Sequence, residues 1–401
     1  MHLYDVPLAF SLVGLALYVV LAGADFGAGI WQLVAGGGPG GKQIRDHAHH
    51  SMAPVWEANH VWLIFVLTVT WTAYPSAFGS IASTLSIPLF VAALGIIVRG
   101  AAYALRAGTS TARELRVIDT VSASASILTP FALGSMAGAI ASRRVPVGNA
   151  AGHLFSSWLN PTSLLVGTLA VAASAYLAAV YLAADATRLR EGELERQFRA
   201  RALAAGLVAG AVAIGGLLVV HADAHRLYHG LVRGGALGGV IVSLLAGATT
   251  LALVWARRFE AARYTAALAV AAVIAAWALA QNPTLLPGLT IQQAAASHDT
   301  LVALIVAVLA GGVILFPSLA LLFRLVLAGR LDHAPTAAPL LPRDGVVAAS
   351  ASGLLGRVAG ACLIAGFGLL TVADAPWAHA IGVTALFAFI ATGFLAAVGE
   401  P

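Results

Sequence analysis

Eleven apolar stretches of roughly twenty residues recur along the chain, separated by polar segments. Crossing a bilayer takes about 20 helical residues, and lipid offers no partner to an unpaired backbone group, so such stretches fold as membrane-spanning helices. Charged residues make up 10% of the chain, against roughly 25% in soluble domains. We therefore predict an all-α polytopic membrane protein with spans at about 8–34, 54–73, 81–105, 120–141, 162–184, 202–221, 235–255, 264–280, 300–327, 353–372 and 377–398.

Basic residues are divided unevenly between the two alternating sets of connections. Of the 22 Lys and Arg residues, 17 fall in the set that begins after the first predicted span, and the other set holds Arg143, Arg144, Arg226 and Arg233. Lys and Arg gather on the cytoplasmic side of membrane proteins. We therefore expect the N-terminus outside and the connection after the first span in the cytoplasm.

The composition also excludes several classes of site. The net charge of +5 comes from basic residues between spans, which is a topology signal and not a nucleic-acid-binding stripe. Cys362 is the single cysteine, so the chain forms no internal disulfide and no cysteine-ligated metal cluster.

The second predicted span opens with an unusual polar group. It begins Pro54-Val55-Trp56-Glu57-Ala58-Asn59-His60, and apolar residues continue to about Thr72. An ionisable side chain inside a span costs about 2.5–3.5 kcal/mol and usually serves a function. Glu57 and His60 are three residues apart and are predicted to share a helix face, while Asn59 projects elsewhere.

Asp25 is the deepest acid that the sequence predicts. It lies about ten residues before the inner end of the first span, roughly 15 Å deeper than the cytoplasmic surface. Glycines at 23, 27 and 29 let a neighbouring helix approach closely. Glu57, His60 and Asp25 together read as a graded proton path from the cytoplasm. The alternative is that these groups only make hydrogen bonds between helices or lie among lipid headgroups.

Further polar residues have simpler predicted roles. Arg99 either extends to the inner surface or pairs with an acid such as Glu57. Asp119 is expected to cap the fourth span at its N-terminus. His47, His49 and His50 are expected in a solvated interfacial loop.

A second histidine group closes the sixth span on the outer side. His221, His225 and His229 recur every four residues, which is a metal-like spacing. We treat them as weak metal candidates, because an interfacial position explains them equally well.

The motifs resemble subunit II of the cytochrome bd quinol oxidases. The resemblance rests on the run from Ala24 to Ile30, on Pro54 to Leu63, and on Arg99-Gly100-Ala101-Ala102-Tyr103. Asn160-Pro161 and the segment from Asn282 to Leu331 are also similar, so about 1–333 is covered.

The resemblance implies nine spans arranged as two four-helix bundles and a peripheral helix. It implies a partner, subunit I, that carries haems b and d and the quinol site. The chain itself is then expected to bind no haem, to stabilise the complex, and to line a proton route through Glu57, His60 and Asp25. Arg99, Trp56 and Asn59 are expected to support that route by pairing and packing. A structural quinone and a small single-span subunit are further candidate partners. The expected location is the bacterial plasma membrane.

Some features depart from the family pattern. Ala22, Gly23 and Ala24 replace a second acid, and Gln292-Gln293 replaces a Trp-Asp pair. A linker and two extra spans at 334–401 follow the family-like domain at 1–333. A divergent redox subunit with a donor other than quinol, a proton-coupled transporter and an inert assembly scaffold therefore stay open as alternatives.

Overall fold

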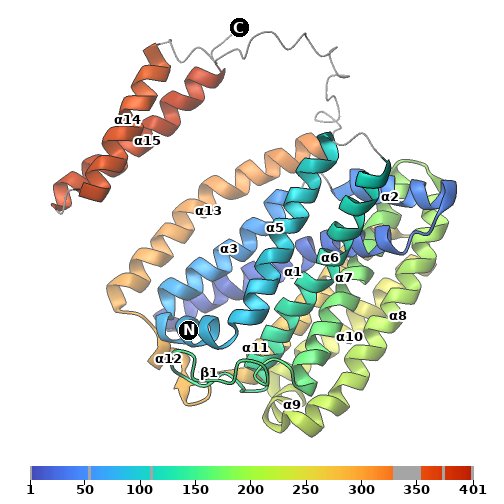
Figure 1. Cartoon of the computed structure of the whole chain (residues 1–401). Helices are drawn as coiled ribbons and strands as arrows, with labels where there is room; N and C mark the ends of the chain where they lie inside the picture. The colour runs from blue at the N-terminus through green and yellow to red at the C-terminus, as the bar shows by residue number, and fades with distance from the viewer. Residues whose placement is uncertain (1, 53–55, 109–111, 328–353, 373–374, 399–401) are drawn as a thin grey trace, which may run out of the picture. The chain divides into compact units, whose positions relative to one another are not determined.

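The structure is a computed structural model that describes residues 2–52, 56–108, 112–327, 354–372 and 375–398. Within these ranges it is helical apart from one two-stranded hairpin, the connection 142–160 between α6 and α7, and short turns (Figure 1). In chain order the elements are η1 (Leu3–Asp5), α1 (Val6–Leu33), α2 (Gly38–Met52), α3 (Trp56–Ala73), α4 (Pro75–Thr84), α5 (Ser86–Gly108), α6 (Ala112–Ala141), α7 (Pro161–Arg188), α8 (Gly192–Asp223), α9 (His225–Leu231), α10 (Gly234–Trp255), α11 (Phe259–Gln281), β1 (Thr284–Leu286), β2 (Leu289–Thr290), α12 (Ile291–Ala294), α13 (His298–Leu327), α14 (Leu354–Val372) and α15 (Pro376–Val398).

Helices α1, α3, α5 and α6 form a first four-helix bundle. α1 packs against α3 and α6, and α5 packs against α6. The contacts are close because small residues line them: a Cβ built on Gly95 would lie 2.2 Å from Oγ1 of Thr129, and one on Gly14 would lie 2.7 Å from Cδ1 of Phe65. Such backbone approach associates helices in lipid, where burial of apolar surface alone does not.

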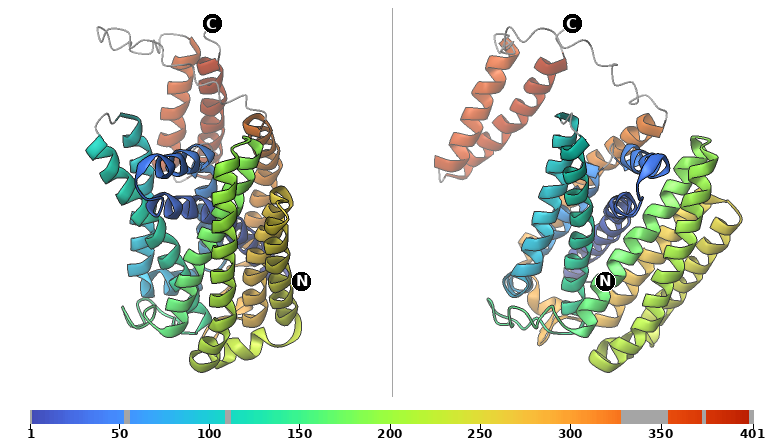
Figure 2. Two further views of the ribbon diagram at one scale, coloured as in Figure 1. Left: turned by 90° about the vertical axis from the view of Figure 1, so that its right-hand side faces the viewer. Right: turned by 45° about the vertical axis from the view of Figure 1, so that its right-hand side comes forward.

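Helices α7, α8, α10 and α11 form the second bundle. α7 packs against α8 and α11, and α10 packs against α8 and α11 (right-hand view of Figure 2, green to yellow). Phe198, Leu182 and Val254 are fully buried in its core beside many alanines. Alternation of alanine with larger side chains lets these four helices interdigitate without voids.

Helix α1 belongs to both bundles. Besides α3 and α6 it contacts α7 and α11. A Cβ built on Gly27 would lie 1.9 Å from the carbonyl oxygen of Ser174 in α7, so only glycine fits there. This confirms the predicted close approach at the glycine-rich stretch and places the neighbouring Asp25 at the junction of the bundles.

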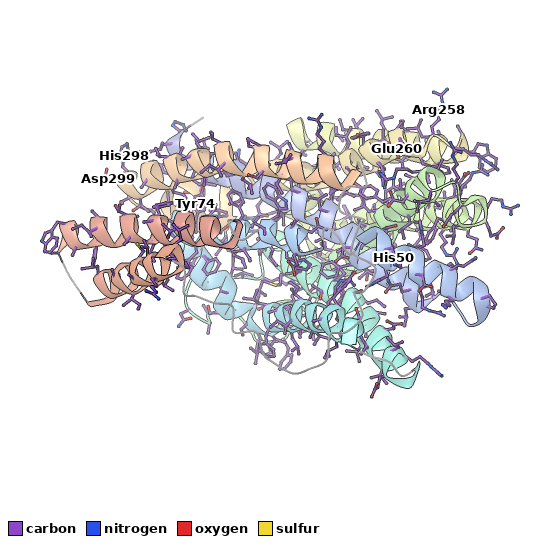
Figure 3. All side chains as sticks on the ribbon, turned by 90° about the horizontal axis from the view of Figure 1, so that it is seen from above. His50, Tyr74, Arg258, Glu260, His298 and Asp299 are labelled. Carbon is purple, nitrogen blue, oxygen red and sulfur yellow. The ribbon has the colours of Figure 1, made fainter. Side chains whose placement is uncertain are left out.

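Short elements close one end of the helical body. Tyr74, between α3 and α4, is fully buried, and its hydroxyl donates to the carbonyl oxygen of Tyr4 at 2.5 Å. Burial raises the pKa of the Tyr74 hydroxyl, so it stays protonated and keeps donating across the physiological pH range. Figure 3 shows Tyr74, His298 and Asp299 toward this end, and His50, Arg258 and Glu260 toward the opposite end.

Helix α13 is peripheral. Only 6% of its most apolar 18-residue stretch is buried. Leu301 and Leu319 nevertheless pack against buried apolar side chains of the helical body. The predicted architecture of two four-helix bundles and a peripheral helix is therefore confirmed.

The chain divides into two compact units, Met1–Phe323 and Arg324–Pro401. In the second unit α14 and α15 pack against each other, and a Cβ built on Gly366 would lie 2.8 Å from Cγ of Leu386. The domain boundary predicted at 333 lies outside the described residues.

The predicted span limits hold for most helices, with instructive exceptions. Among the described residues, eight helices are long and apolar enough to cross a membrane, and α14 and α15 contain shorter apolar helices. α3 is not among the eight, because Glu57, Asn59 and His60 lower the hydropathy of its 18 residues. The third predicted span is divided at Leu85 into α4 and α5, and α6 begins at Ala112, eight residues earlier than predicted.

Candidate functional site

A buried ion pair joins α1 to α5. Asp25 is 0% exposed and Arg99 is 2% exposed. Arg99 donates from Nη2 to Oδ1 of Asp25 at 2.6 Å and from Nε to Oδ2 at 3.0 Å, and Nη2 also reaches the Asp25 carbonyl oxygen at 2.8 Å. This two-point contact is the strong, directional form of a carboxylate–guanidinium pair. Each charge therefore compensates the other inside the protein.

The remaining faces of Arg99 are also occupied. Its Nη1 donates to Oγ of Ser126 in α6, and that hydroxyl donates to the Ser122 carbonyl oxygen at 2.8 Å. The guanidinium carbon lies 5.5 Å from the Phe26 ring centroid and 5.6 Å from that of Tyr103, within reach of cation–π attraction. Arg99 thus ties three helices of the first bundle together.

The arginine needs a glycine opposite it. A Cβ built on Gly29, one turn beyond Asp25, would lie 2.7 Å from Nη1 of Arg99 and 2.2 Å from Oγ of Ser126. The glycine-rich sequence after Asp25 therefore leaves the space in which the guanidinium lies.

The prediction that Arg99 pairs with an acid is confirmed, but the acid is Asp25 and not Glu57. Arg99 does not reach the surface. A deep carboxylate inside the same bundle takes the guanidinium, because leaving either group buried alone would cost several kcal/mol.

The polar residues in the first turn of α3 point in different directions. Asn59 is buried, and its Nδ2 donates to the Leu21 carbonyl oxygen at 3.4 Å. The His60 ring faces α1, with its centroid 6.1 Å from that of Tyr18 and 5.6 Å from that of Phe26. Glu57 is exposed. Glu57 and His60 lie three residues apart on one helix, so their side chains are about 60° apart around its axis, as predicted. Glu57 lies on the exposed part of that face, and His60 lies at its edge against α1.

Glu57 and Asp25 are not in direct contact. In the part of the chain that the structure describes, Asp25 is bonded to Arg99, and no direct hydrogen bond joins its carboxylate to that of Glu57. Trp56 begins α3, but its side chain lies outside the described part of the structure. Asp25 lies inside the bundle and Glu57 on its surface, and the depth gradient of the three groups stays a prediction.

The histidines after the first span lie on a helix and not in a solvated loop, so that prediction is wrong. In α2, His47 is 6% exposed; its Nε2 lies 3.1 Å from the Leu182 carbonyl oxygen, and its ring packs on Phe198. His49 stacks on Tyr103 with ring centroids 5.2 Å apart. α2 therefore lies against both bundles at the end where α1 and α7 finish.

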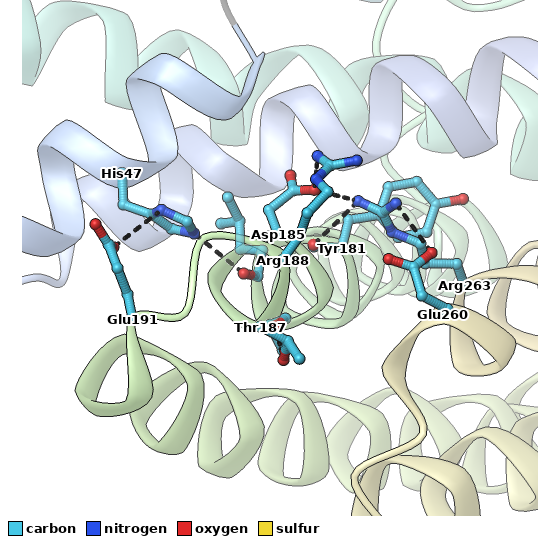
Figure 4. Close-up of polar contacts among 10 residues, drawn as sticks. His47, Tyr181, Asp185, Thr187, Arg188, Glu191, Glu260 and Arg263 are labelled. Carbon is cyan, nitrogen blue, oxygen red and sulfur yellow. Dashed lines mark hydrogen bonds and ion pairs between the residues drawn. The ribbon is translucent and has the colours of Figure 1, made fainter. Parts of the chain in front are cut away.

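A second ionic cluster lies where α7 ends. Asp185, whose side chain is 7% exposed, accepts from Arg188 and from Arg263 of α11, each at 2.5 Å (Figure 4). Nearby, Nδ1 of His47 lies 3.8 Å from Oε2 of Glu191. These contacts fix α2, α7 and α11 to one another. The sequence analysis missed this cluster, although the three-residue spacing of Asp185 and Arg188 on one helix was a usable signal.

The outer histidines lie along the junction of α8 and α9. The ring centroids of His221 and His225 are 5.0 Å apart, and those of His225 and His229 are 6.4 Å apart. Among the residues that the structure describes, no three His, Cys, Asp or Glu side chains are grouped as metal ligands. Asp223 beside them joins neighbouring helices, since its carboxylate accepts hydrogen bonds from Arg144 at 2.5 Å and from the Thr162 hydroxyl at 2.6 Å.

Comparison with known proteins gives a consistent result. The family model described as "Cytochrome bd terminal oxidase subunit II" matches residues 3–326. The chain resembles a solved structure of bd oxidase from Geobacillus thermodenitrificans, with a TM-score of 0.66 and 25% identity, over 82% of this chain and 99% of that one.

A curated relative matches a shorter stretch of the chain. "Cytochrome bd ubiquinol oxidase subunit 2" of Bacillus subtilis is 27% identical over 132 residues, which are 33% of this chain and 37% of the relative. The matched stretch thus spans little more than a third of that relative's length. The family model, in contrast, covers both bundles and most of α13. On that match, the chain belongs to the cytochrome bd terminal oxidase subunit II family.

Proposed function

We propose that this chain is the subunit of a quinol-oxidising terminal oxidase complex that binds no haem and conducts protons. The complex passes electrons from quinol to dioxygen, and haems b and d belong to a partner subunit I. The chain resides in the bacterial plasma membrane with its N-terminus outside. Its family membership and the match to a bd oxidase structure support this proposal.

The observation that carries the proton-conducting role is the buried Asp25–Arg99 pair. Asp25 lies eight residues before the end of α1 at Leu33, about 12 Å along the helix axis. An ionisable pair at that depth in a membrane bundle marks a proton or ion pathway more often than a packing contact. Asp25 is the inner station of the route, and Glu57 and His60 are its stations nearer the cytoplasm.

The exposed face of α3 supports a large membrane partner. Glu57 shares a stripe with Val61, Ile64 and Trp71, which are 48%, 62% and 65% exposed. A carboxylate facing lipid on an apolar stripe is costly. Subunit I covers this stripe, so that Glu57 opens onto the interface and not onto hydrocarbon.

The buried imidazole of the described chain does not fit a haem. An axial histidine needs one ring nitrogen directed at the iron. In His47, Nε2 is bonded to the Leu182 carbonyl oxygen and Nδ1 faces Glu191. We therefore assign the haems to the partner.

Purification from native membranes tests this function. The tagged chain should co-purify with a second, larger polypeptide, and haem absorption bands should appear only in fractions that contain both. The complex should consume oxygen when supplied with quinol. Haem bands on the isolated chain, or purification of the chain with no haem protein, would overturn the proposal.

A second candidate is an assembly scaffold without proton transfer. It is favoured by the hydrogen bonding of Asp25, because both carboxylate oxygens are already held by Arg99. Under this alternative, removing the carboxylate of Glu57 would leave oxygen consumption unchanged once the amount of assembled complex is matched.

A further inference from the structure

Three exposed histidines lie where α8 meets α9, at the end of the helical body opposite α2 (Figure 1). His221 lies in the last turn of α8, His225 begins α9, and His229 lies one turn further on. In the part of the chain that the structure describes, these imidazoles contact other rings but make no hydrogen bond or ion pair. Each neutral ring therefore keeps a nitrogen lone pair for a ligand.

Several other histidines of the chain are already engaged by their own backbone. Nδ1 of His50 lies 2.7 Å from the Asp46 carbonyl oxygen. Nδ1 of His153 accepts hydrogen bonds from the N–H groups of Phe155 and Ser156. The group at the junction of α8 and α9 differs from these because its ring nitrogens face solvent.

The rings of His221 and His225 have the separation of two ligands on one metal ion, since their centroids are 5.0 Å apart. A ring nitrogen lies about 2.0–2.1 Å from a bound Zn²⁺, so the ring centroid lies about 3.2 Å from the ion, and two such rings at a near-tetrahedral angle have centroids about 5 Å apart. The centroids of His225 and His229 are 6.4 Å apart, which would place those rings on opposite sides of an ion. His221 and His225 are therefore the chelating pair.

The four-residue spacing survives the bend between the two helices. The Ala224 N–H donates to the Val220 carbonyl oxygen at 2.9 Å, and the Ala224 carbonyl oxygen accepts from the Tyr228 N–H at 3.1 Å. The hydrogen bonding of α8 thus ends at the residue where that of α9 begins. Two histidines four residues apart on one helical face are a zinc-binding arrangement, and here the pair joins two helices.

Both histidines project from backbone that neighbouring helices hold in place. At the end of α8, Asp223 accepts hydrogen bonds from Arg144 and from the N–H and hydroxyl groups of Thr162. In α9, a Cβ built on Gly230 would lie 2.5 Å from the Ala280 carbonyl oxygen, so this helix lies directly against α11. A backbone that is already ordered lowers the entropic cost of closing a chelate.

The surroundings favour a cation that prefers nitrogen ligands. The Tyr228 ring lies edge-on to the His221 ring, with centroids 4.7 Å apart, and orients it. The carboxyl end of a helix, where His221 lies, carries a partial negative charge. Imidazole suits Cu²⁺, Ni²⁺ and Zn²⁺, whereas Mg²⁺, Ca²⁺ and Mn²⁺ prefer oxygen ligands. The adjacent Asp223 carboxylate is held by Arg144 and Thr162, so the ligand set is nitrogen from the protein and oxygen from water.

We propose that His221 and His225 form a two-imidazole site for a divalent transition cation, Cu²⁺, Ni²⁺ or Zn²⁺, with water in the remaining coordination positions. The bound ion joins the end of α8 to the start of α9 and stiffens the bend at Ala224. Each neutral imidazole donates one nitrogen lone pair, and no covalent bond of the protein is broken. The site does not depend on the proposed proton conduction, and its test does not use oxygen consumption.

The test uses the assembled complex, purified with a tag that contains no histidine and dialysed after treatment with EDTA. Titration calorimetry with Ni²⁺ and Zn²⁺ gives the stoichiometry and the affinity. His221→Ala and His225→Ala each remove one ligand, and the double variant measures binding elsewhere in the complex. His229→Ala is the matched control, because it removes an exposed imidazole one turn further along the same helix.

We expect one ion per complex beyond the binding of the double variant, and a higher midpoint of thermal unfolding when the ion is present. His221→Ala and His225→Ala should each weaken binding by at least about tenfold, and His229→Ala by less than about twofold, because the second imidazole of a chelate binds intramolecularly. Cu²⁺ should bind more tightly than Ni²⁺ or Zn²⁺, and its electron paramagnetic resonance spectrum should show splitting from two nitrogen ligands.

Equal binding by the unaltered complex and the double variant would overturn the inference. A loss in His229→Ala as large as that in His221→Ala would also overturn it, since the chelating pair would then be wrong. Substituting exposed imidazoles should leave the unfolding midpoint in EDTA unchanged. The Cu²⁺ spectrum of the unaltered complex needs no variant, and fewer than two nitrogen ligands at one equivalent would contradict the site directly.

Discussion

Asp25 and Arg99 meet through two hydrogen bonds, of 2.6 Å and 3.0 Å, although 74 residues separate them in sequence. The contact sets the register of α1 against α5 and fixes the depth of the carboxylate in the bundle. It also makes the two residues interdependent, since each is fully enclosed by protein.

Asp25→Asn should destabilise the chain strongly. The amide leaves the Arg99 guanidinium buried without a counter-charge, and breaking a buried pair in this way costs about 3–5 kcal/mol. The midpoint of thermal unfolding of the detergent-purified complex should fall clearly. Replacing Arg99 as well, in Asp25→Asn with Arg99→Gln, should recover part of the loss, because no lone charge then remains. Equal unfolding midpoints for Asp25→Asn and the unaltered chain would show that Arg99 has another partner.

Glu57→Gln should act on turnover and not on stability. Glu57 is exposed in the chain and holds no neighbouring helix, so surface substitutions of this kind usually change stability by less than about 0.5 kcal/mol. Oxygen consumption per haem should fall by roughly tenfold or more if the carboxylate carries protons.

Glu57→Asp is the matched control for that variant, because it keeps the carboxylate and shortens the side chain by one methylene. It should retain most of the activity. Full turnover in Glu57→Gln at normal haem content would favour the scaffold over the proton route.

The helices could be predicted because lipid leaves a chain few choices, whereas their grouping into two bundles came from the family resemblance. Backbone groups in hydrocarbon must pair within their own helix, so hydropathy gives most of the spans, α3 with its polar first turn excepted. Hydropathy does not give the helix limits outside the bilayer. Glu114 and Arg116 extend α6 beyond its apolar part, and for that reason Asp119 was expected at a helix start.

Side-chain partners were harder to predict than helices. The identity of Asp25 as a deep acid follows from its place in one span, but its pairing with Arg99 depends on how α1 and α5 pack. In the same way, the rotation of α3 turns Glu57 outward and His60 toward Tyr18 and Phe26. Helix rotation is set by neighbouring helices, about which the sequence of one span carries little information.

Gly27→Ala should separate α1 from α7. The added methyl would lie 1.9 Å from the Ser174 carbonyl oxygen and 2.6 Å from the Ala178 Cβ, and both are fixed parts of a helix. Relieving such overpacking typically costs 1–3 kcal/mol or more. We expect a lower yield of assembled complex and a lower unfolding midpoint.

Gly23→Ala provides the control on the same face of α1. Its added methyl would make ordinary contacts of 3.5 Å with Leu177 and Ser174, and alanine is the better helix former. It should be neutral or slightly stabilising. Equal damage from both substitutions would mean that the methyl contact with α7 is not the cause.

Asp185→Asn should loosen the second bundle at the end where α7 finishes. The carboxylate is almost fully buried and accepts from Arg188 and Arg263, whose side chains are 46% and 22% exposed. Water screens both arginines in part, so the loss of folding free energy should lie between that of an exposed pair and that of a fully buried pair, at about 2 kcal/mol.

Glu260→Gln is the matched control: Glu260 also pairs with Arg263, but at 3.5 Å and with its side chain 65% exposed. It should cost well under about 1 kcal/mol. The two variants can be compared by limited proteolysis of the connections on either side of α11. Because Asp185 lies in the second bundle and the proposed route through Asp25 lies in the first, Asp185→Asn should leave the pH dependence of oxygen consumption unaltered even where it lowers the amount of intact complex. A shifted pH profile would instead place Asp185 on a proton route of its own.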